Sequence, residues 1–155
     1  MNPYDKEKTR EIWKRVLNEE ESCDCRAFSS ERLREHIAAS KRAACTYRAM
    51  ACCTEGKCRN LLCSFAEDSA MDAKKLETVY FIWTGKCACV PAEKAEKVCC
   101  LADSLRNMYQ TESAEIAMLQ KAAEEMPDYA SVFYALAQDK RCRLEHIMKL
   151  LRCYV

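Results

Sequence analysis

Apolar residues recur along this chain at the three- and four-residue steps that mark one face of a helix. Each of these apolar seams is interrupted by polar residues near its middle. An apolar seam turns a helix toward a core, so a polar residue within the seam points inward and needs a partner or a ligand. Four seams follow one another along the chain, from Leu33 to Ala51, Leu62 to Trp83, Leu101 to Ala122 and Phe133 to Tyr154.

Turn signals between the seams set the expected helix boundaries. Ser29 or Ser30 suits the start of the first helix, because a side-chain hydroxyl there accepts an orphan backbone N–H. Gly85 suits the left-handed position that ends the second helix, and residues 86–98 form the longest connection. The sequence therefore predicts an all-α fold with four long helices, at about 30–54, 58–84, 99–125 and 129–153.

The first part of the chain carries one more amphipathic pattern. A helix is predicted at Tyr4–Glu20, followed by a loop that contains Cys23 and Cys25. We divide the chain into this helix and loop (1–28) and the four-helix part (29–155), and expect a single domain overall. A chain of 155 residues buries roughly 70% of its unfolded surface and needs no staple to fold.

Composition and charge exclude some classes of partner. Lys and Arg total 25 against 24 Asp and Glu, a net charge of +1, which gives no overall attraction to nucleic acid or to a membrane surface. No apolar run approaches the ~20 residues that span a bilayer, and the first ten residues contain no hydrophobic signal core. We expect a cytoplasmic protein; a homodimer through helix faces stays open.

The polar breaks fall near the middle of every predicted long helix. Because four helix midpoints lie at one level of a bundle, these residues are expected to form one central polar layer. Its expected members are Ser40, Ser69, Asp72, Glu112, Lys140 and Arg143, with Glu115 as a further candidate.

Several stretches around these breaks resemble the bundle helices of rubrerythrin-like proteins in the ferritin-like superfamily. The resemblance covers residues 30–153 and implies a ferritin-like four-helix bundle with one long crossover at about 86–98. In that family the central layer holds a di-iron centre, with a Glu on two helices and Glu-x-x-His on the other two. The matching stretches are 37–51, 66–85, 109–112 and 136–143.

The metal ligands do not follow the resemblance. Only Glu112 matches a ligand position of the family. Ser40 stands at the position of the first Glu, and each Glu-x-x-His motif is replaced as a pair. The replacing pairs are Ser69 with Asp72 and Lys140 with Arg143.

Charge accounting suggests what replaces the metal. Asp72 and Glu112 supply negative charges that Lys140 and Arg143 balance, so the layer is neutral without metal, and the two cations would repel ferrous iron. We therefore predict a buried salt-bridge layer, no metal and no cofactor. Two alternatives stay open: the two cations extend outward to water, or Asp72, Glu112 and Glu115 hold a single metal ion.

The chain contains 13 cysteines. Without an export signal we expect reduced thiols, several of them acting as small buried apolar residues. The pairs Cys23–Cys25 and Cys87–Cys89 are candidate thiol sites in loops, for metal or a cluster or for disulfide or redox chemistry. Neither pair has the Cys-x-x-Cys spacing of a strong metal signature.

Three functional hypotheses follow. The first is a non-catalytic, metal-free relative of the rubrerythrin-like proteins with a structural or interaction role. The second is an oxidoreductase or peroxide scavenger with a rebuilt iron or manganese centre. The third is a cysteine-based metal or redox sensor.

Overall fold

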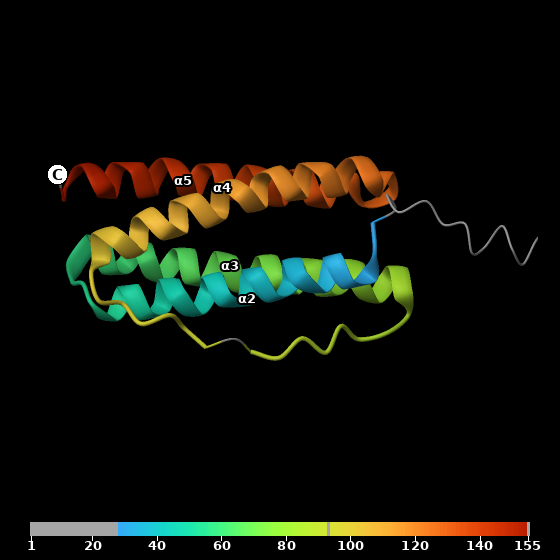
Figure 1. The fold of residues 1–155 in the computed structure, drawn as a ribbon, viewed down its shortest axis with the longest axis horizontal. Coiled ribbons are helices and arrows are strands. Elements are labelled where there is room, and N and C mark those ends of the chain that lie inside the picture. Colours follow the sequence, from blue (N-terminus) through green and yellow to red (C-terminus); the bar gives the residue numbers. More distant parts are fainter. Residues whose placement is uncertain (1–27, 93, 155) are drawn as a thin grey trace, which may run out of the picture.

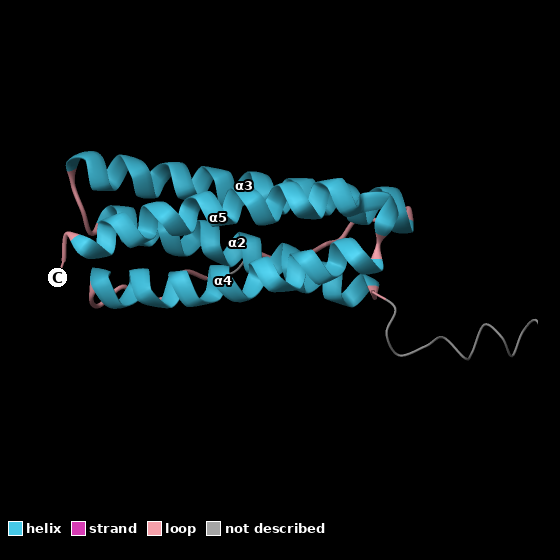
Figure 2. Ribbon diagram, turned by 90° about the horizontal axis from the view of Figure 1, so that it is seen from above, coloured by secondary structure: helices cyan, strands magenta, loops and turns pink. Residues whose placement is uncertain are grey.

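The computed structural model describes residues 28–92 and 94–154, and its helices run along one long axis (Figures 1 and 2). This part of the chain forms a bundle of α-helices without strands, which confirms the prediction of an all-α fold. The helix predicted at Tyr4–Glu20 lies outside the described residues. The elements are α2 (Ser30–Cys52), α3 (Gly56–Thr84), α4 (Leu101–Glu125), the 3-10 turn η1 (Pro127–Tyr129) and α5 (Ala130–Arg152).

Most helix ends follow the expected local chemistry. The hydroxyl of Ser29 accepts a hydrogen bond from the backbone N–H of Arg32 at 3.2 Å and caps α2. Gly85 adopts φ 70° after α3, and its N–H donates to the carbonyl of Phe81 at 2.8 Å. Helix α4 starts at Leu101 and not near Cys99, because Cys100 has extended backbone angles (φ −135°, ψ 124°).

The connections define two antiparallel hairpins, α2–α3 and α4–α5, joined by one long segment. That segment leaves α3 after Thr84 and runs back along the bundle beside α2 before α4 begins (Figure 1). As a result α3 and α4 point in the same direction. The end of α2, the starts of α3 and α4 and the end of α5 therefore share one end of the molecule.

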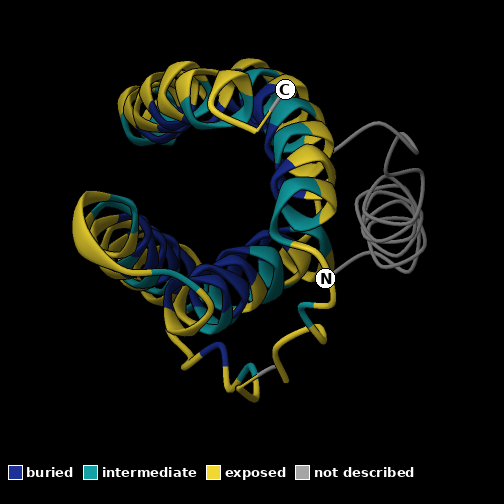
Figure 3. Ribbon diagram, turned by 90° about the vertical axis from the view of Figure 1, so that its left-hand side faces the viewer, coloured by how far each residue is buried: buried dark blue, intermediate teal, exposed yellow. Residues whose placement is uncertain are grey.

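The core consists of two apolar clusters stacked along the bundle. Buried positions lie on the inner faces of the helices, while the outer faces are exposed (Figure 3). The Phe28 cluster contains Phe28, Ile37, Leu76, Leu119, Phe133 and Leu136 among others. The Tyr47 cluster contains Tyr47, Met50, Leu62, Phe65, Leu105 and Ile147 among others.

The ends of two predicted seams are not buried. Trp83 is 39% exposed and Tyr154 is 49% exposed. Trp83 lies in the last turn of α3 and Tyr154 beyond the end of α5, where neighbouring helices cover less of the side chain. The periodic pattern continues to the end of each helix, but the contacts between helices that bury its residues end before the last turn.

Candidate functional site

A layer of buried polar side chains separates the two apolar clusters. Its members come from the middle of each helix, and each is no more than 3% exposed. They are Ser40 on α2, Ser69 and Asp72 on α3, Glu112 on α4, and Lys140 and Arg143 on α5.

Lys140 and Glu112 form a buried ion pair within the α4–α5 hairpin. The ammonium Nζ of Lys140 donates to Oε2 of Glu112 at 2.9 Å. The side chains are 3% and 1% exposed, so the pair is shielded from water. The side chain of Lys140 therefore points into the bundle. It does not extend outward to water, which was the alternative that the sequence left open.

Arg143 connects this pair to α3. Its Nη2 donates to Oδ2 of Asp72 at 2.7 Å, and its Nε lies 3.4 Å from Oε1 of Glu112. The two carboxylates and the two cations thus form one continuous network of opposite charges.

Tyr47 completes the network from α2. Its hydroxyl donates to Oε1 of Glu112 at 3.0 Å, and the tyrosine has no exposed surface. The apolar seam predicts a buried ring at Tyr47 and does not indicate this hydrogen bond. The position of Tyr47 two seam steps beyond Ser40, with a hydroxyl at the tip of the ring, was the available signal.

The pKa shifts show how the network distributes charge. Burial alone would raise the pKa of Glu112, but Lys140 and Arg143 together lower it below its usual value. For Asp72, burial outweighs the nearby guanidinium of Arg143 and raises the pKa of the carboxyl. Glu112 is therefore the electrostatic centre of the layer.

The same balance acts on the donors around Glu112. Burial and the adjacent carboxylate of Glu112 raise the pKa of Tyr47 well above its usual value. Burial would lower the pKa of Arg143, but Glu112 and Asp72 reverse this effect and raise it. The tyrosine therefore stays a neutral donor and the arginine stays charged.

Some polar atoms of the layer have no hydrogen-bond partner in the described part of the chain. They include the hydroxyls of Ser40 and Ser69 and the Nη1 and Nε atoms of Arg143. Unpaired buried hydroxyls cost stability. These two serines occupy positions at which the sequence resemblance implies metal-binding glutamates.

Glu115 points inward but belongs to a separate pair. Its Oε2 accepts a hydrogen bond from Nδ1 of His36 at 3.0 Å, and the histidine is 1% exposed. The ring of His36 stacks on Phe28 with centroids 6.0 Å apart. The structure thus places Glu115 beside the Phe28 cluster and does not join it to Lys140 or Arg143.

A surface groove of about 400 Å³ opens between α3 and α5. Its lining includes Asp72 and Arg143 from the layer, and Asp68, Lys75 and Asp139 at its rim. The Lys75 ammonium lies 3.5 Å from Asp139 across the groove. The charged layer therefore approaches the surface on this side.

Of the loop thiols predicted as sites, Cys87 and Cys89 are described by the structure, and neither belongs to this layer. Cys87 and Cys89 lie exposed and free in the segment after α3, whereas Cys23 and Cys25 lie outside the described residues. Among residues 28–92 and 94–154, no three His, Cys, Asp or Glu side chains are placed so that they could hold a metal ion.

The fold and the site together define an all-α helical bundle with a buried ion-pair layer between two apolar clusters. No known family model matches this sequence, and no curated protein or solved structure matches it either. In the part of the chain that the structure describes, no helix is both long and apolar enough to cross a membrane.

Proposed function

We propose that this chain is a ferritin-like, rubrerythrin-like bundle in which a salt-bridge layer takes the place of the di-iron centre. Its role is structural or in protein interaction, without catalysis. The observation that carries the proposal is the Lys140–Glu112 contact of 2.9 Å. In this contact the ammonium of Lys140 is paired with the carboxylate of Glu112. Glu112 is the one residue that matches a metal-ligand position of the family that the chain resembles.

The chain path supports the ferritin-like part of the proposal. A ferritin-like bundle has two helical hairpins joined by one long crossover, and the segment between Thr84 and Leu101 joins the hairpins in this manner. The polar layer also lies at the level that holds metal in such bundles. These two features do not depend on the identity of any ligand.

Electrostatics support the metal-free part. The charges of Asp72 and Glu112 are matched by Arg143 and Lys140 at 2.7 and 2.9 Å. A ferrous ion inserted here would lie beside two cations that cannot ligate it while protonated. Each carboxylate would also have to give up its present partner.

An interaction role is supported by exposed apolar side chains near the end of α3. Phe81, Ile82 and Trp83 are consecutive and are 54%, 65% and 39% exposed. Together they leave apolar surface exposed around the last turn of α3, where a partner would cover it.

Elemental analysis of protein purified without chelators tests the proposal. We expect iron and manganese well below one equivalent per chain and no peroxide turnover after anaerobic iron loading. Stoichiometric iron or manganese that is lost in Glu112→Ala would contradict it and would favour the oxidoreductase hypothesis.

A rebuilt centre tests the ferritin-like frame separately. The substitutions restore a Glu or a His at each position where the resemblance implies one. If the frame is correct, the folded variant gains iron and the absorption of an oxo-bridged centre, whereas the parent does not. A folded variant that binds no iron would overturn the frame. The substitutions are Ser40→Glu, Ser69→Glu, Asp72→His, Lys140→Glu and Arg143→His.

A further inference from the structure

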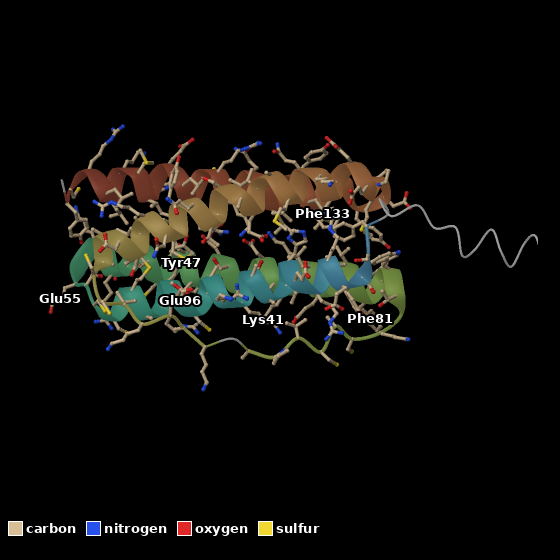
Figure 4. The ribbon with its side chains drawn as sticks, in the orientation of Figure 1. Lys41, Tyr47, Glu55, Phe81, Glu96 and Phe133 are labelled. Carbon is tan, nitrogen blue, oxygen red and sulfur yellow. The ribbon has the colours of Figure 1, made fainter. Side chains whose placement is uncertain are left out.

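The groove between α3 and α5 combines a buried guanidinium with an apolar wall. Its volume of about 400 Å³ lies within the range of small-molecule sites. Because Asp72 and Arg143 line it, the groove opens at the level of the central layer. This level lies between the two apolar clusters, of which Tyr47 and Phe133 mark different positions along the bundle (Figure 4).

Arg143 lies on the inner side of this groove and has an unused donor. Its Nη2 donates to Oδ2 of Asp72 at 2.7 Å, whereas Nη1 has no hydrogen-bond partner in the part of the chain that the structure describes. The side chain of Arg143 is 3% exposed, and a buried charged donor without a partner costs stability. A carboxylate that enters the groove would give Nη1 an acceptor of opposite charge.

Asp68 offers the complementary charge on the same face of α3. It precedes Asp72 by four residues, which is about one helical turn, and it is an exposed residue of the groove lining. Among the described side chains Asp68 has no ion-pair partner, whereas Asp139 is paired with Lys75 at 3.5 Å. The groove therefore presents a free carboxylate about one turn, ~5.4 Å along the helix axis, from the residue that holds the guanidinium.

The charges of the lining favour a ligand that carries both signs. A purely anionic ligand would meet the carboxylates of Asp68, Asp72 and Asp139, against which only Lys75 and Arg143 supply permanent positive charge. A purely cationic ligand would leave Nη1 of Arg143 without an acceptor. A small molecule with one ammonium and one carboxylate matches both unpaired groups.

Beyond Asp68 the lining of the groove is apolar. Leu61 and Phe65 precede Asp68 by seven and three residues, so they share its face of α3. The ring of His146 packs edge-on against Phe65 with centroids 6.1 Å apart and lines this part of the groove from α5. An apolar group that lies against Leu61 and Phe65 would be removed from water.

We propose that this groove binds a free α-amino acid with an apolar side chain. The carboxylate of the ligand accepts from Nη1 of Arg143, its ammonium donates to Asp68, and its side chain lies against Leu61 and Phe65. Binding is reversible and involves no covalent step. The site needs no metal, so it does not depend on the ferritin-like relationship proposed above.

Isothermal titration calorimetry of the full chain tests the proposal with L-methionine, L-leucine and two blocked analogues. We expect both amino acids to bind at a single site. Methionine methyl ester lacks the carboxylate and N-acetylmethionine lacks the ammonium, so each should bind at least about tenfold more weakly than L-methionine. Failure of both amino acids to bind at millimolar concentration would overturn the proposal, and so would undiminished binding of either analogue.

Two substitutions on α3 separate recognition by Asp68 from a general effect of charge. Asp68→Asn should weaken the binding of L-methionine by about tenfold and leave that of N-acetylmethionine unchanged. Glu67 is the exposed neighbour of Asp68 and does not line the groove, so Glu67→Gln should leave both unchanged. Equal weakening by the two substitutions would contradict an ammonium contact at Asp68.

The role of Arg143 is tested by Arg143→Lys, which keeps the positive charge but has no Nη1. This variant should lose the preference for L-methionine over its methyl ester. A folded variant that keeps the preference would contradict the proposed carboxylate contact. If the variant does not fold, the comparison of L-methionine with its methyl ester in the parent chain decides.

Discussion

Nη2 of Arg143 donates to Oδ2 of Asp72 at 2.7 Å, although the two residues lie 71 positions apart in the chain and in different helical hairpins. Both side chains are 3% exposed. Tyr47 makes a second link between the hairpins through Glu112. Because every long helix contributes to this network, its charges are coupled to the docking of α2–α3 on α4–α5.

The first prediction concerns the charge of Glu112. Glu112→Gln keeps the shape of the side chain but leaves Lys140 as a buried cation without its partner. Removing one member of a buried ion pair costs ~3–5 kcal/mol. The free energy of unfolding from urea titration should fall by about this amount.

The matched control for this prediction lies on the same helix. Glu124 is an exposed residue of α4, so Glu124→Gln should change the free energy of unfolding by less than ~0.5 kcal/mol. Equal effects of the two substitutions would mean that the Lys140–Glu112 pair contributes no more to the free energy of unfolding than an exposed carboxylate does.

The second prediction concerns the whole network. Replacing a complete buried ion network with apolar residues of similar size is often neutral or stabilising by ~1–4 kcal/mol. The combined variant should therefore be at least as stable as the parent, although the single Glu112 change is destabilising. If the combined variant instead loses as much free energy of unfolding as the four single substitutions together, the four charged side chains contribute to stability independently. The variant combines Asp72→Leu, Glu112→Met, Lys140→Met and Arg143→Leu.

Helical periodicity was sufficient to find most of the central layer. Lys140 and Arg143 stand in an apolar seam, so a helix that buries its seam must also bury them. The same reasoning placed Asp72 and Glu112 at a common level. Their individual pairing did not follow, because it depends on how far each helix is shifted along its neighbour.

Two features could not be predicted from the sequence and are visible only in the structure. Glu115 and His36 pair across α2 and α4, and a seam pattern says which face a residue occupies but not which residue lies opposite. The long crossover also brings the segment before α4 back to the end of the bundle at which α3 starts. Spacing along the chain carries no trace of that return.

The third prediction concerns Tyr47. Tyr47→Phe removes the only atom that donates from α2 to Glu112 among the described contacts, while it keeps the ring in the Tyr47 cluster. A hydrogen bond to a charged group contributes ~1.5–3 kcal/mol, so the free energy of unfolding should fall by about this amount. Tyr134 is 50% exposed, and Tyr134→Phe should have little effect. A comparable loss in both variants would rule out a special role for the Tyr47 hydroxyl.

The fourth prediction is that the two carboxylates of the layer respond to acid in opposite directions. The pKa of Glu112 is lowered on folding, so its stabilisation is complete above its ordinary value of 4.5 and is lost as the pH falls through the lowered folded pKa. The pKa of Asp72 is raised on folding, so its contribution is most favourable below its ordinary value of 3.8 and is lost as the pH rises through the raised folded pKa.

Urea titrations over a series of pH values check this with two neutral mimics. As the pH falls below about 4.5, the stability advantage of the parent over Glu112→Gln should shrink. Over the acid range down to 3.8, the parent should instead gain stability relative to Asp72→Asn. If both differences move in the same direction, either burial does not outweigh Arg143 at Asp72 or the cations do not outweigh burial at Glu112.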